Sequence, residues 1–327
     1  MRAWVLDESP GSYRWGEVAD PALGPGDVRV RVVASALNHM DLWVARGLPV
    51  PPLPHVPGAD VAGVVEEVGA DVTGVAVGAE VVVDPTVCTP EAIAALGIDA
   101  PVARGTQILG EHQWGGHGEA VVVPARNVVT RPAGRSWAEC AAYPTAHVTA
   151  WRLLRRARLR AGETVLVVGI GGGVSVAAMT VARHLGAEVH VTSRDRAKGE
   201  RALALGAVAA HDSAADRWDV EADVVVESVG PATWAKSVAA LRRGGRLAVC
   251  GGTSGRSVEV HLPTLFFRQL EIIGSTMGSQ EEFAALTGAV AGGLAVHVDH
   301  ELALSDYPAA LERLGRGDQL GKIVLHH

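Results

Sequence analysis

Cysteine is scarce in this sequence. Its three cysteines, Cys88, Cys140 and Cys250, lie far apart in a chain of 327 residues, which excludes a disulfide framework and favours a reducing compartment. No apolar run approaches the roughly 18 uncharged residues that a membrane-spanning helix needs. The opening segment, MRAWVLDESPGSYRW, carries charges a few positions apart, so it lacks the apolar region of a secretory signal peptide. The sequence predicts a cytoplasmic protein that makes no membrane contact.

An excess of positive charge is also missing. The formal net charge is −7, which argues against a broad nucleic-acid-binding face. One local basic run is typical of the solvated end of a helix; it consists of Arg152, Arg155, Arg156, Arg158 and Arg160. Hydrophobic residues make up 48% and charged residues 20% of the chain, as in folded globular proteins. We therefore expect a small-molecule substrate and no nucleic-acid partner.

The chain changes character near residue 130. The part before it contains short alternating segments such as Val28–Val32, which are typical of half-buried strands, and a proline-rich segment, Pro49–Pro57, which predicts an extended loop. From Glu163 onward, apolar runs of strand length alternate with helix-length segments. That pattern predicts a parallel sheet with helices on both faces. The tail after about residue 278 is expected to rejoin the first part.

The pattern also gives expected element bounds. The expected strands of the parallel sheet are Thr164–Val168, Glu188–Thr192, a short strand near Ala209, Asp223–Glu227, Arg246–Cys250 and Leu270–Ser275. The expected helices are Val174–Leu185, one running through Leu205, and Ala232–Arg242. In the tail we expect two helices, a short strand around Val296 and Val298, and a closing strand at Lys322–Leu325.

A glycine cluster follows the first of these strands, in VLVVGIGGGVSVAAM (165–179). Glycines at a strand-to-helix turn let the backbone approach a pyrophosphate, and the helix N-terminus offers N–H groups to it. The expected contacts are Gly171, Gly172, Gly173 and Val174. Ser175 stands where the last glycine of such a motif is expected, and we predict that the site tolerates this change.

The end of the second strand predicts the preferred dinucleotide. An NAD-binding domain places a carboxylate there, about 20 residues after the glycines, to bind the ribose hydroxyls. This sequence has Ser193 at that position, followed by Arg194, Arg196 and Lys198. Cationic donors suit a 2′-phosphate, so NADPH is favoured over NADH. The alternative is that these are ordinary solvated surface charges.

Several motifs together resemble the medium-chain dehydrogenase/reductase superfamily, near its zinc-type alcohol dehydrogenase and quinone oxidoreductase branches. They are ALNHMDLWVARGLP (36–49), PHVPGADVAGVVEEVG (54–69), ILGEHQWGGHGEAVVVPARNVV (108–129), the glycine loop, VVVESVGPATW (224–234), GGRLAVCGGTSG (244–255), IIGSTMG (272–278) and GKIVL (321–325). The resemblance implies an α/β fold, with a mostly-β GroES-like catalytic domain at 1–128 and 278–327. A Rossmann domain with a doubly wound parallel sheet is expected at 129–277.

The resemblance also implies contacts with the cofactor. Glu227, Ser228 and Val229 are expected beside the nicotinamide, and Gly251, Gly252 and Thr253 beside its ribose. Lys322, in the closing GKIVL, is expected to contact the cofactor as well. Two glycines after a strand can also be a simple turn.

The sequence departs from the family at its metal positions. Catalytic-zinc ligands of relatives correspond here to Asn38, Ala59 and Thr145, none of which is a cysteine or histidine. Asp60 follows Ala59, but one carboxylate cannot hold the metal alone. We predict that the catalytic zinc is absent. The alternative is a rebuilt site from His39, His55 and Cys88.

A second zinc of relatives, bound by four cysteines, also lacks its ligands. Only Cys88 remains, because the other positions correspond to Glu91, Ala94 and Ala103. A closed zinc site needs four ligands, so the lobe is expected to fold without metal. Pro90 followed by Glu91–Leu96 predicts a small helix there.

Without a Lewis acid, a conjugated acceptor is easier to reduce than an isolated ketone, because charge spreads into an enolate. We therefore expect an NADPH-dependent, zinc-independent reductase of quinones or α,β-unsaturated carbonyls. The candidate hydrogen-bond donors are Asn38, His39, Tyr143 and Thr145. His39 suits proton donation but can equally be a loop histidine paired with Asp41, and Tyr143 can be plain packing.

Two other functions stay open. One is an alcohol or carbonyl dehydrogenase of the zinc-type family, and the other is a non-catalytic NADPH-binding protein like the crystallins of the quinone-reductase branch. The resemblance also implies a homodimer joined through the edges of the Rossmann sheets, near Leu265–Ile273.

Overall fold

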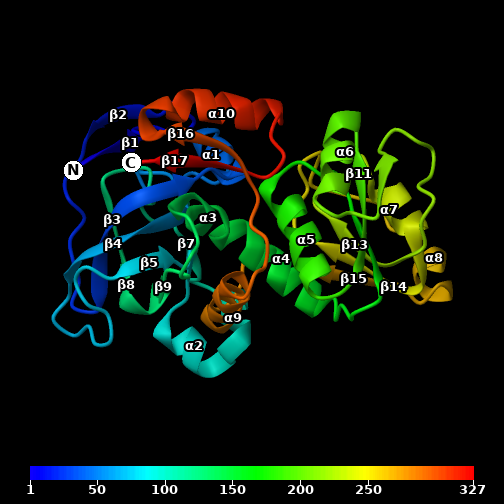
Figure 1. The fold of residues 1–327 in the computed structure, drawn as a ribbon, viewed down its shortest axis with the longest axis horizontal. Helices are drawn as coiled ribbons and strands as arrows, with labels where there is room; N and C mark the ends of the chain where they lie inside the picture. Colours follow the sequence, from blue (N-terminus) through cyan, green and yellow to red (C-terminus); the bar gives the residue numbers. More distant parts are fainter. The chain divides into compact units, whose positions relative to one another are not determined.

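The computed structural model describes all residues, 1–327. The chain divides into two compact units, one of Met1–Val148 with Met277–His327 and one of Thr149–Thr276 (Figure 1). Helix α4 (Pro144–Arg156) starts in the first unit and continues into the second. No helix is both long and apolar enough to cross a lipid bilayer.

The Thr149–Thr276 unit is built on a six-stranded sheet whose strands are all parallel. The strands run in the order β12 (Ala209–Asp212), β11 (Glu188–Ser193), β10 (Thr164–Val167), β13 (Ala222–Glu227), β14 (Leu241–Val249) and β15 (Glu271–Gly274). This doubly wound order confirms the predicted Rossmann fold. Successive strands are added on one side of β10 as far as β12 and then on its other side from β13 onward, so the order of the strands reverses between β10 and β13.

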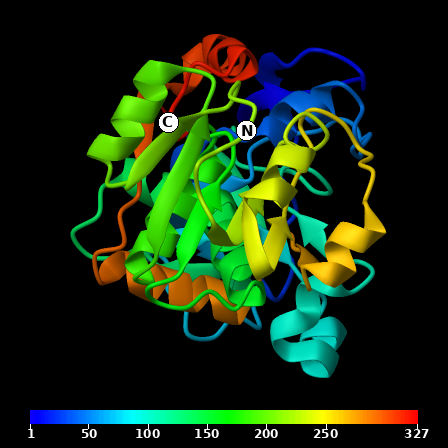
Figure 2. The ribbon, with the colours of Figure 1, turned by 90° about the vertical axis from the view of Figure 1, so that its right-hand side faces the viewer.

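Helices cover both faces of this sheet. The helices are α5 (Gly173–His184), α6 (Arg196–Ala204), α7 (Trp234–Ala240) and α8 (Leu262–Phe267). Figure 2 shows α5 and α6 on one side of the strands and α7 on the other. The central strands are buried on both faces, as their runs of valine and leucine predict. On the α7 side, Leu166, Val225 and Leu247 pack with Trp218.

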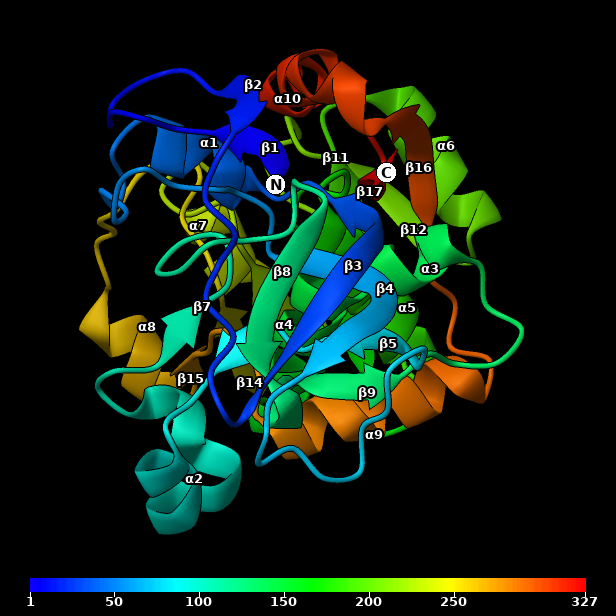
Figure 3. The same ribbon diagram turned by 90° about the vertical axis from the view of Figure 1, so that its left-hand side faces the viewer.

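The other unit is mostly β and confirms the predicted GroES-like fold. Its main sheet runs β16 (Val298–Ala303), β17 (Lys322–His326), β3 (Asp27–Ala36), β4 (Asp60–Val68), β5 (Glu80–Val83) and β9 (Val128–Thr130), with β8 (Ala120–Pro124) also paired to β3 (Figure 3). Two small sheets pair β1 (Arg2–Val5) with β2 (Arg14–Glu17) and β6 (Thr86–Val87) with β7 (Gln107–Ile108). Its helices are α1 (His39–Ala45), α2 (Pro90–Leu96), α3 (Trp137–Ala142), α9 (Gln280–Ala291) and α10 (Tyr307–Arg316), with short 3-10 turns at Gly97–Val102, Ala125–Asn127 and Leu304–Asp306.

The tail rejoins this unit through β17, which pairs antiparallel with β3 so that Val324 lies opposite Ala36. The first residue of β17, Lys322, is thereby brought beside the end of β3 and the start of α1. Valines on β3, β4, β5 and β8 form the core beneath, as their alternation in the sequence predicts.

Some bounds differ from the sequence expectation. The helix expected at Ala232–Arg242 ends at Ala240, because Leu241 already begins β14. Helix α3 is not among the expected elements; it packs against β3 and β4. Helix α8 was also missed, since its six residues are too few for a periodic pattern.

Candidate functional site

Asn38 is held at the start of α1. It follows β3 in extended conformation and is the N-cap residue of the helix. Its backbone N–H donates to Asp41 Oδ2 at 2.7 Å, and Asp41 is fully buried. An acidic residue in the first turn also interacts favourably with the helix dipole. Asp41 therefore fixes the backbone at Asn38, a role that the sequence suggests only through the spacing of a capping box.

Asp60 contacts two of the residues that the family resemblance places at zinc-ligand positions, Asn38 and Thr145. It begins β4 opposite Ala36 and is completely buried. Its Oδ2 accepts a hydrogen bond from Asn38 Nδ2 at 3.0 Å, and its Oδ1 accepts one from the backbone N–H of Thr145 at 2.7 Å. The structure thus brings Asn38 and Thr145 to the same carboxylate.

Lys322 completes this cluster from the other end of the chain. Its ammonium donates to Leu37 O at 2.6 Å, Asn38 Oδ1 at 2.7 Å and Asp60 Oδ2 at 2.7 Å. The side chain is 3% exposed, and an ammonium has three N–H donors. Each donor therefore has a protein acceptor. Lys322 can contact the cofactor only if one of these three hydrogen bonds is broken.

These contacts fix the Asn38 amide. Its oxygen faces the Lys322 ammonium, and one of its two Nδ2–H bonds points to Asp60. An amide nitrogen has two donors, so one N–H remains for a ligand. Because the neighbouring ammonium withdraws charge through Oδ1, that N–H is a polarised donor.

The other two candidate donors have different surroundings. His39 is the first residue of α1; burial lowers its pKa, the charge of Lys322 lowers it further, and Asp41 partly opposes the shift. Tyr143 is completely buried, with its ring 5.8 Å from that of Phe283 and its hydroxyl 3.0 Å from Thr287 Oγ1. Since the Thr287 hydroxyl donates to Phe283 O, Tyr143 must donate to Thr287. This arrangement matches the packing interpretation of Tyr143.

The donor set around Asp60 does not fit zinc. An amide, a methyl group and a threonine stand where the resemblance leads us to expect the three ligands, and the carboxylate is already paired with an ammonium. No group of three or more histidine, cysteine, aspartate or glutamate side chains is placed to hold a metal ion. Zinc prefers thiolate and imidazole ligands, so the residues present offer it no site.

Apolar packing holds the segment where the resemblance leads us to expect a second metal site. Helix α2 confirms the predicted small helix, and Thr89 caps it by accepting from Ala92 N at 3.2 Å. Cys88 is 1% exposed and packs with Ala92 and Ala100. Buried apolar contacts therefore stabilise this segment.

In the other unit, the glycine loop joins β10 to α5 and is anchored to β11. Gly169 N donates to Thr192 Oγ1 at 2.9 Å, and Ile170 N donates to Thr192 O at 2.8 Å. Gly169 has φ +73°, and a Cβ there would lie 2.9 Å from Val229 Cγ2. Only glycine suits both conditions.

Ser175 supports the loop in a way that glycine cannot. Its hydroxyl accepts from Gly171 N at 3.1 Å and donates to Gly172 O at 3.0 Å. No side chain caps the N-terminus of α5, whose N-cap is Gly172. The first N–H groups of the helix have no intrahelical partner, so this end fits the pyrophosphate of a dinucleotide.

The end of β11 has no carboxylate available for a ribose. Ser193 Oγ donates to Asp195 O at 2.7 Å. The nearby Asp195 carboxylate instead caps α6, accepting from Ala197 N at 2.8 Å and Lys198 N at 3.4 Å. Arg194 is exposed, whereas Arg196 forms an ion pair with Glu200.

Glu227 is a structural residue of the nicotinamide-side loops. It is fully buried at the end of β13 and accepts from Val229 N at 2.7 Å, Gly230 N at 3.0 Å and Thr233 Oγ1 at 2.9 Å, and from Ser237 Oγ. All its hydrogen bonds are to its own loop and α7. A carboxylate at the end of an apolar strand does not by itself distinguish this supporting role from the expected contact with the nicotinamide.

The two predicted nicotinamide-side segments lie together. Thr253 N donates to Ser228 O at 3.2 Å, and Ser254 N donates to Val229 O at 2.7 Å. A Cβ at Gly251 would lie 3.1 Å from Ser228 O. The close approach therefore favours glycine at 251.

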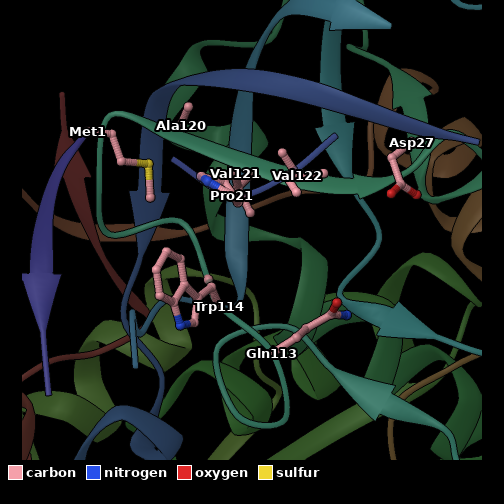
Figure 4. A pocket seen from close by; sticks show the side chains of 10 residues that line it. Met1, Pro21, Asp27, Gln113, Trp114, Ala120, Val121 and Val122 are labelled. Carbon is pink, nitrogen blue, oxygen red and sulfur yellow. The ribbon is translucent and has the colours of Figure 1, made fainter. Parts of the chain in front are cut away.

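A hollow of about 240 Å³ lies elsewhere in the GroES-like unit. Figure 4 shows the indole of Trp114 on one side of it and the side chains of Val121 and Pro21 on another. The residues that line it are Met1, Pro21, Ala22, Asp27, Gln113, Trp114, Gly115, Ala120, Val121 and Val122. None of them is a predicted site residue, so this hollow is separate from the cluster around Asp60.

Comparisons with known proteins agree with these features. Residues 24–133 match the alcohol dehydrogenase GroES-like domain family, and residues 173–291 match the zinc-binding dehydrogenase family. The chain is 32% identical to a zinc-type alcohol dehydrogenase-like protein of Schizosaccharomyces pombe, over 93% of this chain and 91% of that one. It is 30% identical to an acryloyl-coenzyme A reductase of Metallosphaera sedula, over 99% of both chains.

Among solved structures, an NAD-dependent alcohol dehydrogenase superposes with a TM-score of 0.94 at 36% identity, over the full length of both chains. The likeness therefore extends through both units. The chain belongs to the zinc-type alcohol dehydrogenase-like branch of the medium-chain dehydrogenase/reductase superfamily, and is an oxidoreductase.

Proposed function

We propose that the protein is an NADPH-dependent, zinc-independent reductase that transfers hydride to a conjugated acceptor, either an α,β-unsaturated carbonyl or a quinone. The observation that carries the proposal is the Asn38–Asp60–Lys322 cluster at the zinc-ligand positions. It supplies one polarised N–H donor and no metal ligands.

When bound, the reduced nicotinamide supplies the hydride. Addition of hydride to the β-carbon of a conjugated acceptor moves negative charge onto the carbonyl oxygen, where one or two hydrogen bonds stabilise it. The free N–H of Asn38 donates to that oxygen, and Lys322 and Asp60 keep the amide oriented. His39 then donates a proton to the enolate carbon or oxygen. Tyr143, whose hydroxyl is bonded to Thr287, takes no part.

The cofactor is held by residues of the Rossmann unit. The N-terminus of α5, with Gly172, Gly173 and Val174, binds the pyrophosphate. Ser193, Arg194 and Lys198 receive the 2′-phosphate, since the Asp195 carboxylate is occupied in capping α6. The segments at Ser228–Val229 and Gly251–Thr253 flank the nicotinamide ribose.

The acceptor class has support from one relative. The acryloyl group named for the Metallosphaera sedula reductase is a C=C bond conjugated to a carbonyl. The second candidate is an alcohol dehydrogenase, which the names of two other relatives favour. A non-catalytic NADPH-binding role is the third, and the orientation of the Asn38 donor argues against it.

A panel of acceptors tests the proposal directly. Purified enzyme is mixed with NADPH and with enals, enones, enoyl thioesters and quinones, and absorbance at the nicotinamide band is followed, with NADH as the control. Parallel assays oxidise primary and secondary alcohols with and without a chelator. Oxidation of alcohols that chelation abolishes would falsify the proposal. Binding of NADPH without turnover of any acceptor supports the non-catalytic alternative.

We also propose that two copies associate in the cytoplasm through the edge of the Rossmann sheet. Strand β15 is an edge strand, and Phe266 and Phe267 on α8 are 59% and 67% exposed. An unpaired edge beside exposed aromatic rings suits association with a second copy. Analytical ultracentrifugation of wild type and Phe266→Glu tests this, since a buried glutamate at the interface shifts the protein to monomer.

A further inference from the structure

Two histidines of the Rossmann unit lie side by side at the edge of its sheet. His190 belongs to β11 and His211 to the edge strand β12 (Figure 3). In the register of the two strands, His190 lies opposite Ala209 and His211 opposite Thr192. The histidines are therefore diagonal neighbours, and alternation along each strand places both on the same face of the sheet.

Their ring nitrogens are in direct contact. Nδ1 of His190 is 3.0 Å from Nε2 of His211, and the ring planes are only 12° apart. Such a hydrogen bond needs one nitrogen with a proton and one with a free lone pair. At least one ring is therefore in the neutral form that binds metal ions.

The separation suits a metal ion that takes both nitrogens as neighbouring ligands. Metal–imidazole bonds are about 2.0–2.1 Å long, and two such bonds at about a right angle place their nitrogens close to the observed 3.0 Å. Copper(II) and nickel(II) prefer right-angled, square-planar arrangements of nitrogen and oxygen ligands. The rings need only turn, and both are half-buried rather than enclosed.

Burial of the rings lowers the pKa of both histidines, and two nearby carboxylates partly oppose that effect. The carboxylates of Glu188 and Asp219 lie near enough to act electrostatically on His190 and His211 respectively. No third histidine, cysteine, aspartate or glutamate joins the pair as a ready ligand, so solvent occupies the other coordination positions. From this geometry we propose that His190 and His211 together bind one divalent transition-metal ion, copper(II) or nickel(II) in preference to zinc(II).

This site is independent of the reductase chemistry proposed above. A bound ion links the edge strand β12 to β11. Because the ion binds the folded protein, it stabilises the folded state by mass action. It also means that metal found in the purified protein does not by itself indicate a catalytic metal. The histidine variants below separate the two sources.

Nickel(II) binding to the full-length protein tests the proposal. Isothermal titration is run on wild type, His190→Gln, His211→Gln and the double variant, with His184→Gln as the matched control, since His184 is an exposed histidine of the same unit. Loss of a residue that only hydrogen-bonds to a metal ligand weakens metal binding roughly 10–100-fold. Loss of either histidine ligand itself is therefore expected to lower the affinity for nickel(II) at least about tenfold. His184→Gln retains it.

A second readout uses copper(II) and electron paramagnetic resonance. We expect hyperfine structure from two equivalent nitrogens in wild type and its loss in either single variant, with far-ultraviolet circular dichroism confirming that each variant is folded. Binding by the folded double variant as tight as that of wild type overturns the proposal. Uptake of less than one equivalent by the wild-type protein at millimolar nickel also overturns the proposal. The two histidines then form only a hydrogen bond with each other.

Discussion

The glycine loop and the cluster around Asp60 both depart from the residues that the family resemblance leads us to expect, yet they differ in what stands in their place. At the loop, Ser175 replaces a glycine, and its hydroxyl bonds to Gly171 and Gly172 so that the backbone keeps its form. At the cluster, an amide and a threonine stand where the family resemblance leads us to expect zinc ligands, and the Lys322 ammonium donates to oxygens of Asn38 and Asp60. A site made of backbone N–H groups tolerates side-chain replacement, whereas a site made of side chains changes its chemistry.

The largest effect is expected where the cluster holds a buried charge. Lys322→Met leaves the Asp60 carboxylate without its cation and lowers the free energy of unfolding by about 3–5 kcal/mol. Urea denaturation measures the loss. The double variant Asp60→Asn, Lys322→Met removes both charges and recovers part of the stability. A loss below about 1 kcal/mol in the single variant contradicts a buried ion pair here.

The next effect concerns the donor itself. Asn38→Asp removes the free N–H and lowers kcat for an enone about 10²–10³-fold, as loss of one oxyanion donor does. Stopped-flow and steady-state assays measure it, and NADPH affinity serves as the control because its expected contacts lie in the other unit. An unchanged kcat shows that charge develops away from Asn38.

The role of His39 predicts that kcat depends on pH. Its pKa is lowered from the usual value near 6.5 by burial and then by Lys322, so the protonated form is lost as pH rises through that lowered pKa. If His39 donates the proton, log kcat falls over the same range. His39→Gln removes this dependence and lowers kcat by about 10². A pH profile that is identical in the variant assigns the proton to solvent.

A smaller effect is expected at the dinucleotide side. Ser193→Asp places a carboxylate where the 2′-phosphate is expected, and shifts the ratio of kcat/KM for NADPH over NADH at least about tenfold toward NADH. Ser193→Ala is the matched control, since it adds no charge. If the ratio stays constant, the basic residues after β11 are solvated surface charges.

The smallest effect tests the loop's tolerance. Ser175→Ala removes two hydrogen bonds to the loop, each contributing about 0.5–1.5 kcal/mol, and weakens NADPH binding only a few-fold because the N–H groups of α5 remain. Fluorescence titration of NADPH measures it. If NADPH affinity falls in Ser175→Ala by as large a factor as kcat falls in Asn38→Asp, the glycine loop is no more tolerant of replacement than the cluster around Asp60.

Local sequence was sufficient for the elements and for the glycine loop. Residues 165–179 encode strand, turn and helix within one short segment, and the valine runs of β10 and β13 encode burial on both faces. Short helices such as α3 and α8 escaped prediction because six residues show no clear period. The hydrogen-bond partners of Glu227 are also close in sequence, at Val229–Ser237. A carboxylate at a strand end can play many roles, however, so the sequence alone does not assign this one.

The sequence by itself determined the two folds and the family, and it predicts that the zinc ligands are missing, because each inference depends on residue type within a short motif. Only the tertiary structure decided what replaces those ligands. Asn38, Asp60 and Lys322 are separated by up to 284 residues and meet because β17 pairs with β3. Long-range pairing of strands, which no local pattern records, turned three unremarkable polar residues into one oriented donor.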